Sequence, residues 1–70
     1  MWGKNPRIII DRWVCVRTKD CETRFFAGWM EFSPDFVTFH REGGHLCMFN
    51  KAAIVRIHTE DREIEVPEDE

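Results

Sequence analysis

Apolar and polar residues alternate with a period of two along much of this chain, which is the pattern of half-buried β-strands. In residues 13–19, for example, Val14, Val16 and Thr18 share one face. The alternation and the turn residues between its runs predict five strands, over residues 13–19, 22–32, 36–41, 45–49 and 54–58. No amphipathic helix of useful length interrupts them, so we expect an all-β domain.

The second of these strands carries large apolar side chains on both of its faces. Phe26, Met30 and Phe32 fall on one face, and Phe25, Ala27 and Trp29 fall on the other. A strand that is buried partly on each side must bend. Gly28 is the expected bend point, because a residue without Cβ relieves crowding where a sheet curls. The turn Ser33-Pro34-Asp35 then ends the strand. We therefore predict a small, strongly bent antiparallel barrel of five strands, of the SH3-like or OB-like kind.

The first eleven residues admit two interpretations. Asn5-Pro6 is a pair that opens helices, with asparagine as the cap and proline in the first turn. The three isoleucines at residues 8–10 are β-branched and favour extended backbone. We expect a strand here and keep a short N-terminal helix as the alternative. The barrel itself is assigned to residues 12–59.

Charge is distributed unevenly along the chain. Residues 60–70 hold seven acidic residues and one arginine, whereas residues 1–59 hold nine Lys and Arg against six Asp and Glu. Such an acidic C-terminal tail is expected to be solvated and disordered, at least beyond Pro67. In a second interpretation, the tail competes with nucleic acid for the basic face of the domain.

The size and the cysteine content restrict the class of protein. A single domain of 70 residues buries a modest core, so its stability depends on additional interactions such as disulfides, a metal or partner chains. Three cysteines without short paired spacing argue against a disulfide framework and favour a reducing, cytoplasmic location. No apolar run approaches the length of a membrane-spanning helix, so no membrane partner is expected.

The central stretch AGWMEFSPDFVTF, a Gly-Gly hairpin and the segment MFNKAAIVRI resemble the two-part motif of the Sm-like (LSm/Hfq) family. Gly28, Met30, the turn at residues 33–35 and the strand that follows match the first part in order and spacing. The resemblance covers roughly residues 12–59 and suggests a divergent bacterial or phage member. Phe49-Asn50-Lys51 stands where the bacterial RNA chaperone Hfq has Tyr-Lys-His.

The resemblance implies a cytoplasmic homo-oligomeric ring of about five to seven subunits that binds single-stranded RNA through its pore-side turns. The residues that it assigns to RNA are Asp35, Phe36, Phe49, Asn50 and Lys51. In this role Phe36 stacks on a base, Lys51 neutralises a phosphate, and Asn50 or Asp35 reads a base edge.

Other interpretations remain open at this stage. Phe36 also fits a core position, and Lys51 also fits a solvated turn. The candidate metal ligands His40, His45, Cys47 and His58 lack metal-site spacing, and no residue stands out as catalytic, so we expect no cofactor, no metal and no enzyme. The alternative function is an oligomeric small β-barrel that binds protein rather than nucleic acid, for instance a phage-encoded subunit.

Overall fold

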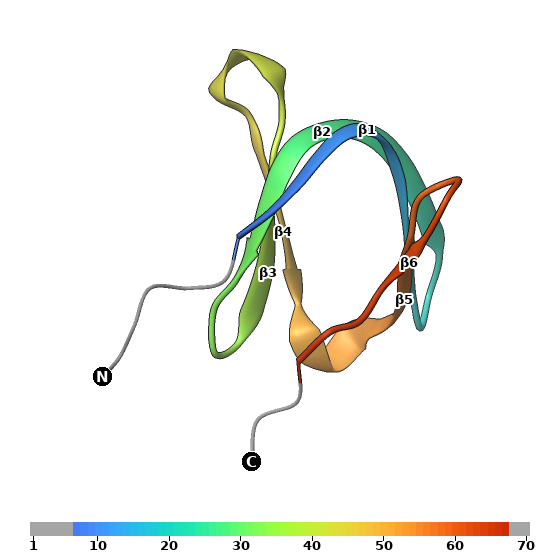
Figure 1. Cartoon of the computed structure of the whole chain (residues 1–70). Coiled ribbons are helices and arrows are strands. Elements are labelled where there is room, and N and C mark those ends of the chain that lie inside the picture. The colour runs from blue at the N-terminus through green and yellow to red at the C-terminus, as the bar shows by residue number, and fades with distance from the viewer. Residues whose placement is uncertain (1–6, 68–70) are drawn as a thin grey trace.

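The computed structural model describes residues 7–67, which form one antiparallel sheet of six strands. The strands are β1 (Arg7–Thr18), β2 (Glu22–Phe32), β3 (Phe36–His40), β4 (Leu46–Asn50), β5 (Ile54–His58) and β6 (Glu63–Ile64). They pair in the order β4-β3-β2-β1-β5-β6, so β4 and β6 are the two edges of an open sheet (Figure 1). The all-β prediction is confirmed, whereas the five-stranded count is wrong because β6 was not expected.

The first five strands lie close to the predicted ranges, but β1 is longer than expected. The isoleucine run and residues 13–18 form one continuous strand from Arg7. The alternative helix would open at Asn5-Pro6, which lies outside the described residues. Within residues 7–67 the helical segments are two three-residue 3₁₀ turns, η1 (Glu42–Gly44) and η2 (Lys51–Ala53), and neither is long or apolar enough to cross a membrane.

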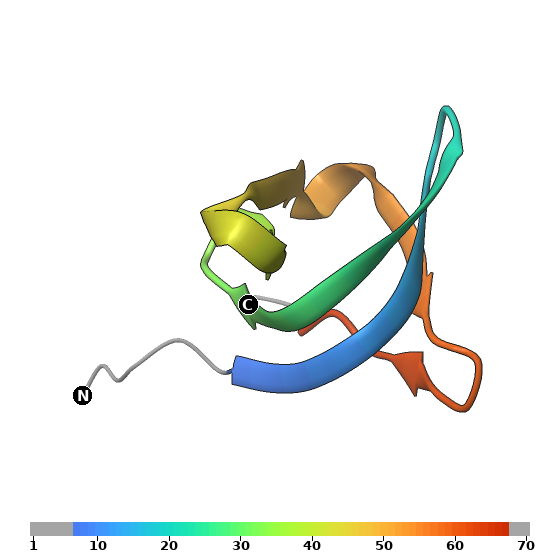
Figure 2. The ribbon, with the colours of Figure 1, turned by 90° about the horizontal axis from the view of Figure 1, so that it is seen from above.

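The sheet curls strongly because its connections require it. β4 and β5 are separated by β3, β2 and β1 in the sheet, yet in the chain they are joined by the three residues of η2. The four steps from Asn50 to Ile54 span about 14 Å at most, whereas strands four places apart in a flat sheet lie about 19 Å from each other. The strands must therefore wrap around an interior, as the view from above shows (Figure 2). The predicted barrel would require its edge strands to pair with each other. In the described sheet β4 and β6 each have one neighbouring strand, so no strand pairing closes the barrel within residues 7–67.

β1 and β2 bend at the same place. Their register shifts between Ile9 and Arg12 of β1, where two residues of β1 have no partner in β2. The partners of Ile9 and Arg12 are Trp29 and Ala27, so the irregularity lies opposite Gly28. Asp11 has a positive φ of 50°, a conformation that aspartate tolerates better than most residues. This geometry is a β-bulge, which bends a strand and increases its twist.

The bend exchanges the two faces of β2. Phe25 and Ala27 point into the core before Gly28, and Met30 and Phe32 point into it afterwards. The change of face explains why the sequence shows large apolar residues on both sides of this strand. The buried core is completed by side chains from the other strands: Ile10, Val14, Val16, Val37, Phe39, Ile57 and Ile64.

The C-terminal segment packs on the sheet as far as Val66, although residues 60–70 were expected to form a solvated acidic tail that is disordered at least beyond Pro67. Ile64 of β6 is buried opposite Ile57, and Val66 packs against the same core. The turn before β6 is held by Arg12, whose Nη1 lies 2.8 Å from Oδ2 of Asp61. Arg62 reaches back and donates a hydrogen bond from Nη2 to the carbonyl oxygen of Ile9 (3.0 Å), at the bulge. Residues 68–70 of the expected tail lie outside the described residues.

Gly28→Val tests the bend. A Cβ at Gly28 would lie 3.5 Å from the carbonyl oxygen of His40, an ordinary contact, so Gly28→Ala should change the free energy of unfolding by less than about 1 kcal/mol. Valine adds two γ-methyl groups beyond this contact, and we expect Gly28→Val to cost about 1–3 kcal/mol in denaturant unfolding. Equal effects of both substitutions would show that close approach at Gly28 does not constrain the strand.

Asp61→Asn tests the packing of the C-terminal turn. The hydrogen bond from the Thr59 hydroxyl, followed by the nearby Arg12 guanidinium, lowers the pKa of Asp61 below its ordinary value. A carboxyl with a lowered folded-state pKa stabilises the fold above its ordinary pKa of about 3.9, and this contribution is lost as the pH falls through the folded-state pKa.

Asp61→Asn should therefore lower the melting temperature at neutral pH. The melting temperature of the variant should also fall less than that of the unchanged chain when the pH is lowered. Thermal unfolding between neutral and acidic pH measures both effects. A double-mutant cycle with Arg12→Ala separates the ion pair from the contribution of Thr59. A melting temperature that falls in acid as steeply in Asp61→Asn as in the unchanged chain would contradict the assignment.

Candidate functional site

Two turns that were expected to carry function meet at one end of the sheet. The first is the β2–β3 turn at residues 33–35, and the second is the segment 50–53, which comprises the last residue of β4 and η2. They are joined by a backbone hydrogen bond of 2.9 Å, from the Lys51 N–H to the carbonyl oxygen of Asp35. We call these two segments, together with Phe36, the turn pair. It borders an open hollow of ≈ 450 Å³ lined by Pro34, Asp35, Asn50, Lys51, Ala52, Ile54, Val66 and Pro67.

Local hydrogen bonds fix the shape of both turns. Ser33 donates to the carbonyl oxygen of Phe36 from its backbone N–H at 2.9 Å and from its hydroxyl at 3.2 Å. Asn50 caps η2, since its Oδ1 accepts a hydrogen bond of 2.9 Å from the Ala52 N–H. The cap occupies one of the lone pairs of the Asn50 side chain and leaves its amide N–H₂ group available for a ligand.

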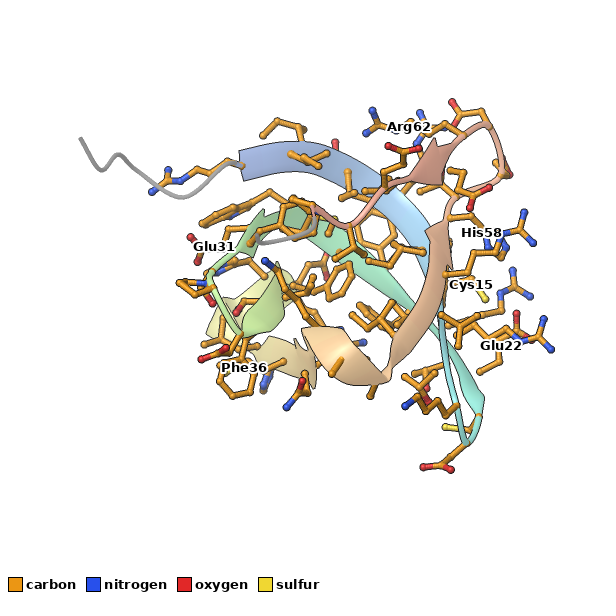
Figure 3. The ribbon with its side chains drawn as sticks, turned by 90° about the horizontal axis from the view of Figure 1, so that it is seen from below. Cys15, Glu22, Glu31, Phe36, His58 and Arg62 are labelled. Carbon is orange, nitrogen blue, oxygen red and sulfur yellow. The ribbon has the colours of Figure 1, made fainter. Side chains whose placement is uncertain are left out.

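The two phenylalanines assigned to RNA lie on opposite faces of the sheet. Phe36 pairs with Asn50 across β3 and β4, and 40% of its surface is exposed on the outer face (Figure 3). Phe49 is half-buried on the inner face, where its ring packs against Phe25 and Phe39. The structure therefore places Asp35, Phe36, Asn50 and Lys51 at the turn pair, while the ring of Phe49 belongs to the core.

The outer face of the edge strand β4 is apolar beside the turn pair. Leu46 is 54% exposed there and Met48 is 56% exposed. At the other side of the sheet, β6 covers β5 only at Ile57 and His58. The preceding part of β5 has no second neighbouring strand within residues 7–67, and its Val55 is 62% exposed.

A second group of chemically active side chains lies on the outer face of β2, β1 and β5. It consists of Glu22, Cys15 and His58, whose ligand atoms all lie within 4.8 Å of one another. We call it the thiol cluster. Cys15 is paired directly with His58, and the β1–β2 register places Glu22 diagonally across from it. The group borders an open hollow of ≈ 370 Å³ and lies far from Phe36 (Figure 3).

The thiol of Cys15 is held in its protonated form. Its Sγ donates a hydrogen bond of 2.9 Å to Oε2 of Glu22. Burial raises the pKa of Cys15, and Glu22 raises it further, against the smaller opposite effects of Arg24 and Arg17. The same hydrogen bond lowers the pKa of Glu22. A thiol with a raised pKa is a poor nucleophile at neutral pH, so the arrangement does not resemble an activated catalytic cysteine.

Most of the metal ligands considered from the sequence lie apart from this cluster. His40 stacks on Trp29, with ring centroids 3.6 Å apart, and its Nε2 lies 2.8 Å from Oε2 of Glu31. Cys47 contacts the Arg41 guanidinium, and His45 is exposed beside the Gly43-Gly44 turn. Within residues 7–67, the group of three possible ligands that the fold assembles is Cys15, Glu22 and His58.

Sequence reasoning missed Cys15 and Glu22 because the cluster depends on pairing between distant segments. Cys15 meets His58 only through the pairing of β1 with β5, which strand alternation does not specify. The available signal was the position of Cys15 on the same face as Arg17, opposite the apolar residues Val14 and Val16.

Comparison of the chain with protein-family models, with curated proteins and with solved structures finds no match.

Proposed function

We propose that this protein is an Sm-like RNA-binding protein that forms a homo-oligomeric ring and binds single-stranded RNA at the turn pair. The observation that supports this most directly is the hydrogen bond between Lys51 and Asp35, which joins the two turns that the motif resemblance assigns to RNA. It brings a base-stacking ring, an amide and an ammonium group to one end of a single subunit. These are the groups that bind unstacked bases and phosphates.

Ring assembly follows from the two incompletely paired edges of the sheet. An exposed strand edge is a template for pairing with another chain. β4 carries exposed Leu46 and Met48, and the uncovered part of β5 carries exposed Val55. β4 of one subunit joined to β5 of the next is a head-to-tail contact, which produces a ring if its rotation closes. The chain in this proposal is cytoplasmic, which agrees with the free thiols of its three cysteines.

A ring compensates for the weak charge of each turn pair. Asp35 and Lys51 have opposite charges, and Lys51 is the basic residue among those that line the hollow. One subunit therefore offers RNA a single stacking platform and one phosphate contact. Repeating that pocket around a ring multiplies the affinity through effective concentration without any stronger contact.

A second candidate function is a ring that binds protein without nucleic acid. It is favoured by the exposed apolar residues Phe36, Leu46 and Met48 beside one another on β3 and β4, which resemble a protein-binding patch. The two functions differ in whether the turn pair binds phosphate, so RNA titration separates them.

The first test is assembly. Light scattering or native mass spectrometry should show a closed oligomer rather than a monomer of 8.4 kDa at micromolar concentration. Met48→Lys should shift this oligomer towards monomer, because a charge on an edge strand opposes pairing. Ile9→Lys, at an exposed apolar position on β1, is the matched control and should leave assembly unchanged. A stable monomer for the unchanged chain would overturn the ring.

The second test is RNA binding by the turn pair. In titrations with short U-rich and A-rich RNAs at two salt concentrations, Lys51→Ala should weaken binding to both and flatten the salt dependence, because a phosphate contact is lost. Phe36→Ala should weaken binding by about 1–3 kcal/mol per stacked base with little change in salt dependence. Arg17→Ala, on the face of the thiol cluster, is the control. Each variant is compared only after its assembly has been checked.

A truncation of the acidic C-terminus must retain the buried side chain of Ile64. Deletion from residue 61 would remove this buried side chain, so the deletion should begin at residue 68. Loss of three acidic residues should raise RNA affinity, most at low salt. Undetectable binding at low salt in both the full chain and this deletion would favour the protein-binding ring.

A further inference from the structure

The imidazole of His58 contains an unsatisfied polar atom. Its Nδ1 is buried and has no hydrogen-bond partner among the described residues. A buried polar atom without a partner is costly and uncommon in native proteins. The same imidazole is a member of the thiol cluster, with the buried thiol of Cys15 and the carboxylate of Glu22. One residue of the cluster therefore has a ring nitrogen whose hydrogen-bonding capacity is unused among the described residues.

We propose that Cys15, Glu22 and His58 bind a divalent transition-metal ion of the zinc class. Their ligand atoms lie within 4.8 Å of one another. Ligands on a tetrahedral zinc ion, with bonds of about 2.0–2.3 Å, are separated by roughly 3.3–3.8 Å. Small changes in side-chain torsion bring the three atoms to that separation, because they project from neighbouring strands with fixed register.

The kinds of ligand select the metal. A thiolate and an imidazole favour zinc, cobalt and similar ions, whereas magnesium and calcium require a set of oxygen ligands. The metal replaces the thiol proton, which is released to solvent, so that Cys15 binds as a thiolate. Thiolate and carboxylate then supply two negative charges that balance the divalent ion. Three protein ligands leave a fourth position towards the adjoining hollow, which is also lined by Thr59 and Glu60.

The strand arrangement gives the site the rigidity that metal binding requires. The three ligands come from β1, β2 and β5, which are adjacent in the sheet. Val14 and Val16, on either side of Cys15, are buried on the opposite face and hold this part of β1 in place. Metal binding here is independent of RNA binding, because the thiol cluster and the turn pair lie on different parts of the surface.

The experiment uses the full chain without an affinity tag, kept reduced by a reductant that is not a thiol. Zn²⁺ is titrated in competition with a chromophoric chelator, and Co²⁺ is added separately to record its absorption spectrum. We expect one Zn²⁺ per chain and a thiolate-to-cobalt charge-transfer band. Cys15→Ser, His58→Gln and Glu22→Gln should each weaken Zn²⁺ binding by at least about tenfold, and Cys15→Ser should abolish the charge-transfer band.

Matched controls use the same residue types elsewhere in the chain. Cys47→Ser, His45→Gln and Glu42→Gln should bind Zn²⁺ as the unchanged chain does. Circular dichroism checks each fold, and if Cys15→Ser does not fold, His58→Gln and Glu22→Gln carry the test. The absence of stoichiometric Zn²⁺ binding would overturn the proposal. So would binding that persists in the three cluster variants, or that falls equally in the controls.

Discussion

The coordinated bend of β1 and β2 is the constraint on which the rest of the structure depends. The bulge at Ile10 and Asp11 lies opposite Gly28, so both strands turn at one point and the sheet can wrap around its core. Without this curvature the three residues of η2 would be too short to connect β4 with β5. The turn pair lies at the end of the β3–β4 ladder, where the pairing of Phe36 with Asn50 brings residue 51 against residue 35.

Much of this fold was accessible from the sequence, and what was missed has a physical explanation. Alternation located the first five strands, and the apolar residues on both sides of Gly28 indicated the bend. The bulge at Asp11 was hidden because a bulge is defined by pairing with another strand. The packing of Ile64 and Val66 on the core was not predicted, because these two residues stand among acidic residues whose charge is typical of a solvated tail.

The two candidate sites also differ in whether their residues can be found from neighbouring positions in the sequence or only from the pairing of distant strands. The positions of Asp35, Phe36, Asn50 and Lys51 beside two turns were predictable, because the sequence marks both turns between runs of alternating residues. The inward position of Phe49 follows from its place on β4, where it faces Phe25 and Phe39. The thiol cluster was not predictable, because its ligands come from strands whose pairing is set by the whole topology.

The position of Cys15 is difficult to explain by packing alone. Val14 and Val16 supply the core contacts of this part of β1, and Cys15 points to the opposite face. Only 7% of its surface is exposed because side chains of neighbouring strands, among them Glu22 and His58, surround the thiol from outside. A small apolar residue would avoid placing a thiol beside a carboxylate, and a polar partner for His58 would satisfy its buried Nδ1. In the proposed site a metal ion would bind the thiolate, the carboxylate and the imidazole together, which gives the position of Cys15 between Glu22 and His58 a chemical reason.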